Sequence, residues 1–307
     1  MTAAVARLRF WSLAPAGFLR LALASCAGLF LVVTSGAFVR LTGSGLGCEN
    51  WPRCGDKPYP EQGFHAFVEF GNRLVALVGL ALTLVTWLAA RKVDGLPRGA
   101  QLAALGAFLV TLAQIPMGAI TIAVDLHPLA VMTHFLLALV VLALAVVVAV
   151  EALRLVSGGV APAGPRWLRL FVTWAGIPTA AALVVTGAVA TASGPHPGAS
   201  EDVERLGIEI TDTVYVHVRV AAAFGIGVLL IGWFLWRLRD RYPGVFQLWA
   251  ALLVALVLQA ILGEVQYRTA LPWGLVLVHV FLAAAIWALS MALAYALWRT
   301  PAALTRQ

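Results

Sequence analysis

Long apolar stretches separated by short polar segments run along the whole chain. Each stretch holds about 20 or more mostly apolar residues, the length that an α-helix needs to cross a bilayer. The eight stretches occupy residues 18–39, 67–90, 101–122, 128–150, 168–191, 213–236, 246–265 and 273–297. They are continuously apolar instead of alternating, which excludes a transmembrane β-barrel. The pattern therefore predicts an all-α polytopic membrane protein with eight transmembrane helices.

The first four predicted helices resemble the last four in sequence. Both halves carry a Gly-Ala pair near the end of the first helix, a Gln-x-x-x-Gly motif in the third, and a Pro followed by a His in the fourth. The matching segments are 34–43 with 185–194, 114–118 with 259–263, and 128–134 with 272–279. Each half has an even number of helices, so the repeat is parallel. We expect two pseudo-symmetric four-helix bundles, residues 1–156 and 157–307.

Basic residues are concentrated on one side of the predicted helices. The two termini and the second, fourth and sixth connections hold 14 of the 21 Lys and Arg residues, but only 3 of the 14 acidic residues. Because cytoplasmic segments are enriched in Lys and Arg, this asymmetry predicts that both termini are cytoplasmic. The first apolar stretch is too long for a signal peptide, so we expect it to be retained. The 14 basic residues are Arg7, Arg9, Arg20, Arg91, Lys92, Arg98, Arg154, Arg166, Arg169, Arg237, Arg239, Arg241, Arg299 and Arg306.

Composition supports this interpretation. The chain of 307 residues is 62% hydrophobic and 11% charged, whereas soluble domains are about 45–50% apolar and about 25% charged. These values exclude a soluble enzyme and a disordered chain. They also exclude a nucleic-acid-binding protein, although the pI is about 9.9, because the net charge of +7 reflects membrane topology.

Histidines recur at matching positions on the even-numbered predicted helices. His134 and His279 each lie about 10 Å below the same membrane surface, at a rise of about 1.5 Å per residue. His217 lies a few residues into the sixth apolar stretch. A histidine at membrane depth can simply hydrogen-bond between helices, but two on facing helices form a natural axial pair for haem iron. We therefore expect His217 and His279 to bind a haem in the C-terminal half.

The N-terminal half has a different polar set opposite His134. Asn72 stands where a counterpart of His217 would be, between Glu69 and Arg73. One imidazole, one carboxylate and one cation suit an exchangeable substrate and proton transfer better than a permanent haem. His65 shares a helical face with Glu69 and Asn72, so it is an alternative ligand or a proton relay. An i, i+4 salt bridge between Glu69 and Arg73 is the structural alternative.

The three cysteines divide into one apolar and two loop residues. Cys26 lies within the first apolar stretch and is expected to be inert. Cys48 and Cys54 lie in the first outer connection, where a disulfide can persist. A structural disulfide, a redox-active thiol pair and a metal-binding pair are all compatible with this spacing. His127 and His196 are expected to be ordinary loop histidines.

Motifs across the chain resemble one known family. The segment VRLTGSGLGCENWPRC at residues 39–54 closely resembles the first outer-loop signature of haem A synthases. The resemblance continues at residues 69–73, 114–118, 134, 191–198, 217 and 279. It covers essentially the whole chain, and the eight helices and internal duplication of that family match the architecture expected above.

The resemblance implies oxidation of the C8 methyl group of haem O to the formyl group of haem A, by successive hydroxylations, for terminal cytochrome oxidases. It implies that His217 and His279 hold haem b, and that the N-terminal half takes haem O. The family motif Glu-x-x-His-Arg is matched by Glu69 and Arg73, whereas Asn72 replaces its histidine. This departure resembles an actinobacterial-type branch and makes His65 a candidate substitute.

The expected chemistry assigns roles to several polar side chains. Glu69 would stabilise positive charge beside the porphyrin or accept a proton, with His134 on the substrate iron. Arg73 and Arg219 would bind haem propionates. We expect a bacterial cell membrane location, and haem O synthase, oxidase assembly proteins and a quinone or other electron acceptor as partners. A di-haem quinone-linked electron carrier and a haem or small-molecule transporter are the alternatives.

Overall fold

The computed structural model describes residues 13–48, 50–159, 161–199 and 202–306. Arg7 and Arg9, which contribute to the charge asymmetry, and Glu49 of the loop motif lie outside the described residues.

The prediction of eight transmembrane helices is confirmed. Within the described ranges, eight helical segments are long and apolar enough to cross a membrane, and the fold is all-α. The helices are α1 (Pro15–Leu41), α2 (Phe64–Ala90), α3 (Arg98–Ala123), α4 (Pro128–Val156), α5 (Arg166–Phe171), α6 (Ile177–Ser193), α7 (Ile210–Leu238), α8 (Pro243–Arg268) and α9 (Trp273–Trp298). The spans extend between one and six residues beyond their apolar stretches, because helical hydrogen bonding continues into the polar flanks.

The fifth span is not one regular helix. A π-helical turn, η1 (Val172–Gly176), separates α5 from α6. Pro178 stands at the start of α6 and has no N–H to donate to the preceding turn. A wider turn before a proline accommodates the missing hydrogen bond without ending the span. Hydropathy alone could not reveal this interruption, because the segment is apolar throughout.

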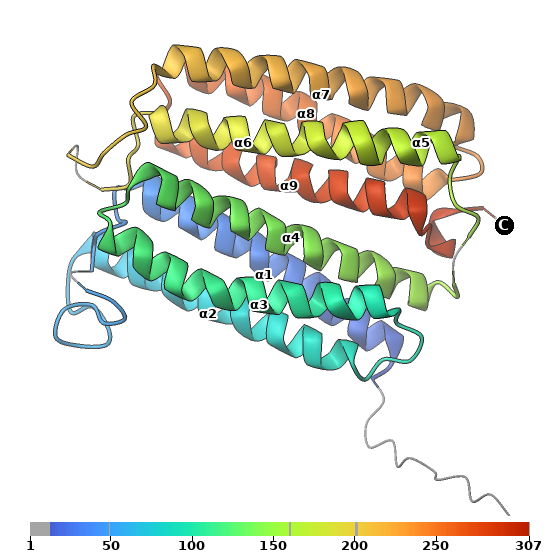
Figure 1. The fold of residues 1–307 in the computed structure, drawn as a ribbon, viewed down its shortest axis with the longest axis horizontal. Helices are drawn as coiled ribbons and strands as arrows, with labels where there is room; N and C mark the ends of the chain where they lie inside the picture. Colours follow the sequence, from blue (N-terminus) through green and yellow to red (C-terminus); the bar gives the residue numbers. More distant parts are fainter. Residues whose placement is uncertain (1–12, 49, 160, 200–201, 307) are drawn as a thin grey trace, which may run out of the picture.

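The helices pack as two groups that follow the chain order. Helices α1–α4 contact one another, α6–α9 contact one another, and the groups meet where α1 and α4 pack against α9 and where α4 packs against α6. Figure 1 shows the two groups lying one above the other, with all long helices nearly parallel or antiparallel. Leu142 and Leu293 are buried in the core. The indole N–H of Trp287 on α9 donates to the carbonyl of Leu139 on α4 at 2.8 Å, directly joining the two groups.

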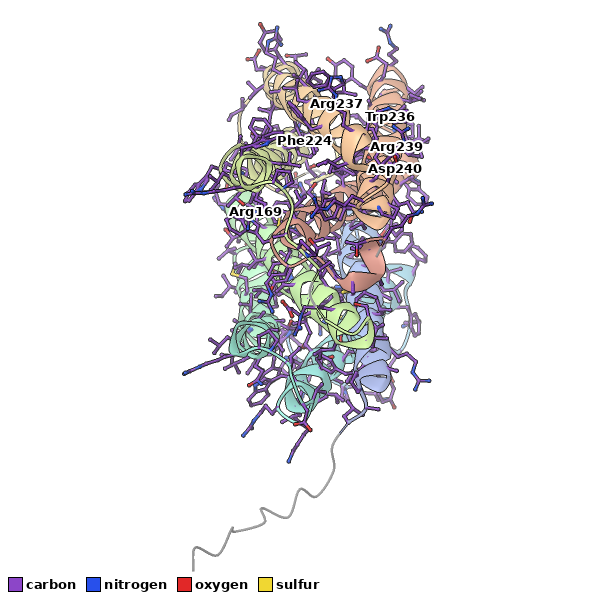
Figure 2. All side chains as sticks on the ribbon, turned by 90° about the vertical axis from the view of Figure 1, so that its right-hand side faces the viewer. Arg169, Phe224, Trp236, Arg237, Arg239 and Asp240 are labelled. Atoms are coloured by element: carbon purple, nitrogen blue, oxygen red, sulfur yellow. A yellow bond between two sulfur atoms is a disulfide. The ribbon has the colours of Figure 1, made fainter. Side chains whose placement is uncertain are left out.

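The connections separate into two ends of the molecule. One end of the molecule, here called the disulfide end, holds the connection with Cys48 and Cys54. The connections that lie there are α1–α2, α3–α4, α6–α7 and α8–α9 (Figure 1). The other connections lie together with the C-terminus at the opposite end, here called the C-terminal end. Figure 2 looks onto the C-terminal end, where Arg169, Arg237 and Arg239 are labelled. Arg239 lies over the ring of Trp236 at 4.2 Å. Arginine paired with tryptophan is typical of a membrane–water interface.

A buried carboxylate joins the two groups near the C-terminal end. Glu151 on α4 is fully buried and forms ion pairs with Arg154 and with Arg299 beyond α9. The hydroxyl of Tyr295 on α9 donates to the same carboxylate at 2.9 Å. The hydrogen bond to Glu151 raises the pKa of the Arg299 guanidinium above its ordinary value, so this cation stays charged.

Candidate functional site

One large cavity lies between the two helix groups. Its volume is about 1290 Å³, above the range of about 300–1,000 Å³ that is usual for drug-sized ligands. The polar side chains that line it include Asn72 and His134 from the first group and His217 and His279 from the second. The predicted half-sites therefore open into a shared space that can admit a ligand of porphyrin size.

The two histidines of the C-terminal half face each other across this cavity. The ring centroids of His217 on α7 and His279 on α9 are 6.5 Å apart. Thr186 lies 3.1 Å from Nδ1 of His217 and donates its own proton to the carbonyl of Ala182. Thr186 can therefore accept the Nδ1 proton of His217, which leaves the Nε2 lone pair free for a metal.

The backbone of His279, the second histidine of this pair, is held by the neighbouring helix. Gln259 on α8 donates to the carbonyl of His279 at 3.0 Å. Nδ1 of His279 is buried and has no hydrogen-bond partner among the described residues. A buried imidazole nitrogen without a hydrogen bond is costly to retain, so His279 is a side chain whose Nδ1 the described part of the fold does not satisfy.

The N-terminal half repeats these contacts with one exchange. Gln114 on α3 donates to the carbonyl of His134 at 3.0 Å, and Nδ1 of His134 is again buried without a partner in the part described. At the position matching Thr186, Ser35 on α1 donates at 2.7 Å to Oδ1 of Asn72. Asn72 therefore occupies the same contact as His217, as the aligned sequences predict, but offers an amide where His217 offers an imidazole.

Glycines bring the neighbouring helices close to the three cavity histidines His217, His279 and His134. A Cβ at Gly187 would lie 3.1 Å from Cε1 of His217, and one at Gly263 would lie 3.4 Å from Cε1 of His279. The corresponding distance from Gly118 to Cε1 of His134 is 3.6 Å. The Gly of each Gln-x-x-x-Gly motif thus faces the histidine whose carbonyl the Gln binds.

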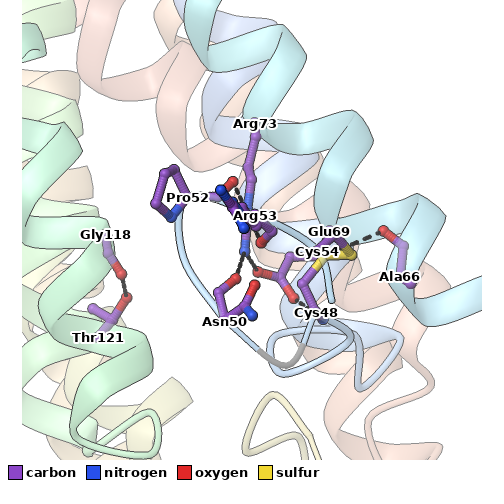
Figure 3. A network of polar contacts seen from close by, with 10 residues as sticks. All are labelled: Cys48, Asn50, Pro52, Arg53, Cys54, Ala66, Glu69, Arg73, Gly118 and Thr121. Carbon is purple, nitrogen blue, oxygen red and sulfur yellow. Dashed lines mark hydrogen bonds and ion pairs between the residues drawn. A yellow bond between two sulfur atoms is a disulfide. The ribbon is translucent and has the colours of Figure 1, made fainter. Parts of the chain in front are cut away.

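Glu69 and Arg73 form the ion pair expected from their spacing and also hold the first outer connection (Figure 3). Glu69 is buried, and its Oε2 accepts the backbone N–H of Cys48 at 2.8 Å. Arg73 donates to the carbonyls of Pro52 at 3.1 Å and Arg53 at 2.9 Å. The pair therefore fixes both sides of the connection against α2.

The predicted disulfide is confirmed. Cys48 and Cys54 are joined by a disulfide bond that closes the segment held by Glu69 and Arg73. Trp51 within this segment lines the cavity, as does Arg73. The disulfide segment therefore forms part of the cavity wall at the disulfide end.

Three other residues predicted for the site lie outside the cavity lining. Glu69, His65 and Arg219 are not among the described residues that line the cavity. His65 is exposed and hydrogen-bonds Ser44 at 2.8 Å through Nδ1. Arg219 is exposed and stacks on the ring of Tyr215.

The two histidines interpreted as loop residues also make local contacts. His196 hydrogen-bonds the carbonyl of Leu271 at 2.8 Å. His127 lies 3.6 Å from Glu204. Both contacts join connections at the disulfide end, as expected for loop residues, although His196 also lines the cavity.

Arg40 is a polar residue of the cavity that the sequence interpretation did not assign. It lies one residue before the end of α1 and lines the cavity. A charged residue near the end of an apolar helix was the available signal, because ionisable groups at membrane depth are commonly functional. Glu151, one of the three acidic residues on the basic side, carries the same signal at the other end of the molecule.

The cavity offers two imidazoles in its C-terminal half, from His217 and His279. Within the described residues, no group of three or more His, Cys, Asp or Glu side chains is placed to hold a bare metal ion. Two imidazoles can still complete the coordination of an iron whose four equatorial nitrogens come from a macrocycle.

Comparison with known proteins identifies similar sequences. The family model COX15-CtaA, described as a cytochrome oxidase assembly protein, matches residues 19–291. A heme A synthase of Bacillus pumilus is 28% identical over 117 residues, which are 36% of this chain and 37% of that protein. A heme A synthase of Shouchella clausii is 34% identical over 97 residues, 31% and 32% of the two chains. One of Symbiobacterium thermophilum is 32% identical over 111 residues, 34% and 36%. The aligned region spans about a third of each of these relatives.

Proposed function

Since the chain belongs to the COX15-CtaA family of cytochrome oxidase assembly proteins, we propose that it is a haem A synthase. The reaction converts the C8 methyl group of haem O to the formyl group of haem A. It exchanges two C–H bonds for one C=O bond, which is a four-electron oxidation and needs an electron acceptor. The names of the relatives from Bacillus pumilus and Shouchella clausii support this activity.

The observation that carries the proposal is the asymmetry of the two half-sites in one cavity. The C-terminal half, residues 157–307, offers two imidazoles, His217 and His279, and can hold a porphyrin from both faces. The N-terminal half, residues 1–156, offers His134 and the amide of Asn72. A porphyrin bound by one imidazole is held by one iron–nitrogen bond fewer than a porphyrin bound by two, so the N-terminal half suits the ligand that exchanges and the C-terminal half suits the cofactor that stays.

The residues of the C-terminal half fit haem b. The 6.5 Å between the ring centroids of His217 and His279 leaves room for one metal ion between two imidazole nitrogens. The oriented Nε2 of His217 suits this role. When bound, haem b would supply one-electron transfer between the substrate and an acceptor.

In the N-terminal half the proposed roles are divided between binding and positioning. His134 binds the substrate porphyrin, and Asn72 offers a polar contact opposite it. Glu69 acts as a positioning residue, since both of its carboxylate oxygens are engaged by Cys48 and Arg73. Through Arg73 and the disulfide segment it shapes the cavity wall.

The setting of the reaction follows from the nature of the substrate. Haem O is apolar and carries a farnesyl chain, so it reaches the cavity from the lipid. We propose that the protein lies in the bacterial cell membrane with both termini cytoplasmic, as the basic residues favour. Haem O synthase would supply the substrate, oxidase assembly would consume haem A, and a quinone or another acceptor would take the electrons.

Pigment analysis tests the proposal. Expressed with a haem O source, the protein should yield extractable haem A and a low-spin haem b spectrum. The His134→Ala and Glu69→Ala variants should lose haem A but keep the low-spin spectrum, whereas His217→Ala should lose haem b. A wild-type protein with two low-spin haems and no haem A would instead indicate an electron carrier, and a colourless wild-type protein would contradict both functions.

A further inference from the structure

Three arginines near the disulfide end differ in what neutralises their charge. Arg73 pairs with the buried carboxylate of Glu69. Arg219 is exposed and stacks on Tyr215, outside the cavity lining. Arg40 is partly buried and lines the cavity, and it forms no ion pair with any carboxylate in the described part of the chain. Among these three, Arg40 is the one that lines the cavity without a carboxylate partner among the described residues.

The hydrogen bonds of Arg40 leave most of its donors free. Its Nε donates to the carbonyl of His196 at 2.9 Å, and its Nη2 donates to the carbonyl of Thr191 at 3.0 Å. A guanidinium has five N–H donors, so three remain, including both on Nη1. Two neutral carbonyls do not cancel the charge, and an uncompensated cation at membrane depth is costly.

The position of Arg40 relates it to the paired histidines. Arg40 lies on α1 but binds Thr191 near the end of α6. Thr191 follows Gly187, the glycine that faces His217, by four residues, a rise of about 6 Å along a helix. The guanidinium therefore reaches from the N-terminal half to the second group of helices, about one helical turn toward the disulfide end from His217.

We propose that Arg40 binds a propionate of the porphyrin held by His217 and His279. This inference rests on the proposed function, because it requires haem in the C-terminal half. A carboxylate is the anion that a porphyrin carries at its edge, and a guanidinium with two free parallel donors binds it through two charge-assisted hydrogen bonds. One residue of the N-terminal half would thus take part in binding the cofactor of the other half.

A purely structural role predicts different behaviour. Arg40 also binds the carbonyl of Thr191 at the C-terminal end of α6, where a cation is favourable without any ligand. Under that alternative, removing the charge lowers thermal stability and leaves the haem unchanged. Under our proposal, removing the charge lowers the midpoint potential of the low-spin haem, because a nearby positive charge favours the reduced iron.

The test measures haem content, midpoint potential and thermal unfolding of purified full-length protein. Arg40→Gln should lower the potential and increase haem loss severalfold. Arg40→Lys should have a midpoint potential close to that of wild type, because the positive charge remains. It should retain haem less well than wild type, because an ammonium cannot bind a carboxylate through two parallel hydrogen bonds. Arg205→Gln, at an exposed arginine of the α6–α7 connection, is the matched control and should resemble wild type.

The outcomes separate this inference from the proposed function. Wild-type protein without low-spin haem overturns both. Wild-type protein with low-spin haem, combined with an unchanged potential in Arg40→Gln, overturns only the role of Arg40. If Arg40→Gln does not fold, Arg40→Lys decides the matter, since unchanged haem retention in that variant contradicts propionate binding.

Discussion

Gly187 lies so close to His217 that a single methyl group should disturb the imidazole. A Cβ at position 187 would lie 3.1 Å from Cε1 of His217, whereas carbon atoms in contact are normally about 3.5–4.0 Å apart. The ring would have to move by about 0.4 Å to restore a normal contact. The Gly187→Ala variant should therefore retain haem b less well than wild type.

The size of the effect follows from the restraint on His217. Thr186 holds one side of the ring, so the imidazole can move only by leaving its preferred rotamer. A rotation of about 30° costs about 0.5–1.5 kcal/mol, and a shift of about 0.4 Å at the tip of the ring needs a smaller rotation, so the cost is about 0.5 kcal/mol. Since about 1.4 kcal/mol corresponds to a tenfold change in an equilibrium constant, haem b should bind about twofold more weakly.

The matched control is the corresponding glycine of the N-terminal half. A Cβ at Gly36 would lie 3.9 Å from Oδ1 of Asn72, an ordinary contact. Both variants replace a helical Gly with Ala, so the gain in helix propensity is the same. The assay is the ratio of haem b to protein after purification, followed by the rate of haem transfer to apomyoglobin. Equal haem retention in Gly187→Ala and Gly36→Ala would refute the reasoning.

Two further predictions concern the junction of the helix groups and the N-terminal half-site. Glu151→Gln should lower the free energy of unfolding by about 2–4 kcal/mol. The buried carboxylate accepts hydrogen bonds from Arg154, Arg299 and Tyr295. Each hydrogen bond to a charged group contributes about 1.5–3 kcal/mol, and the bond from Arg299 contributes less because this side chain is partly exposed. Thermal unfolding in detergent measures this, and an unchanged midpoint would contradict it. Asn72→His should add a second low-spin haem signal and reduce haem A release, since a second imidazole would turn the substrate site into a retaining one; an unaltered spectrum with normal haem A yield would argue against the role given to Asn72.

Sequence periodicity predicted the spans because lipid enforces a simple rule on them. Every backbone polar group in the bilayer core must be satisfied within the helix, so length and apolarity suffice to locate a span. The equivalence of Asn72 and His217 was also predictable, because duplicated halves repeat their contacts. The same alignment matches Ser35 with Thr186, which hold these two side chains.

Contacts between distant segments could not be predicted in this way. The spacing of Glu69 and Arg73 predicted their ion pair but not their hold on the disulfide segment, which depends on where that segment folds back. The bond from Arg40 to Thr191 crosses between the two halves. Such contacts depend on the packing of helices far apart in sequence, and a single chain gives no periodic signal for them.

Hydrogen bonds and an ion pair join the two helix groups to each other at both ends of the molecule. Arg40 and the backbone pair of Gly45 and Gly198 join them at one face, and Glu151 with Arg299 joins them at the other. A carrier that works by alternating access must rock one half against the other, opening each face in turn. In this protein, opening either face would break one of these polar contacts between the helix groups. We therefore expect the ligand of the cavity to enter and leave laterally, between helices and within the membrane, without crossing from one aqueous compartment to the other.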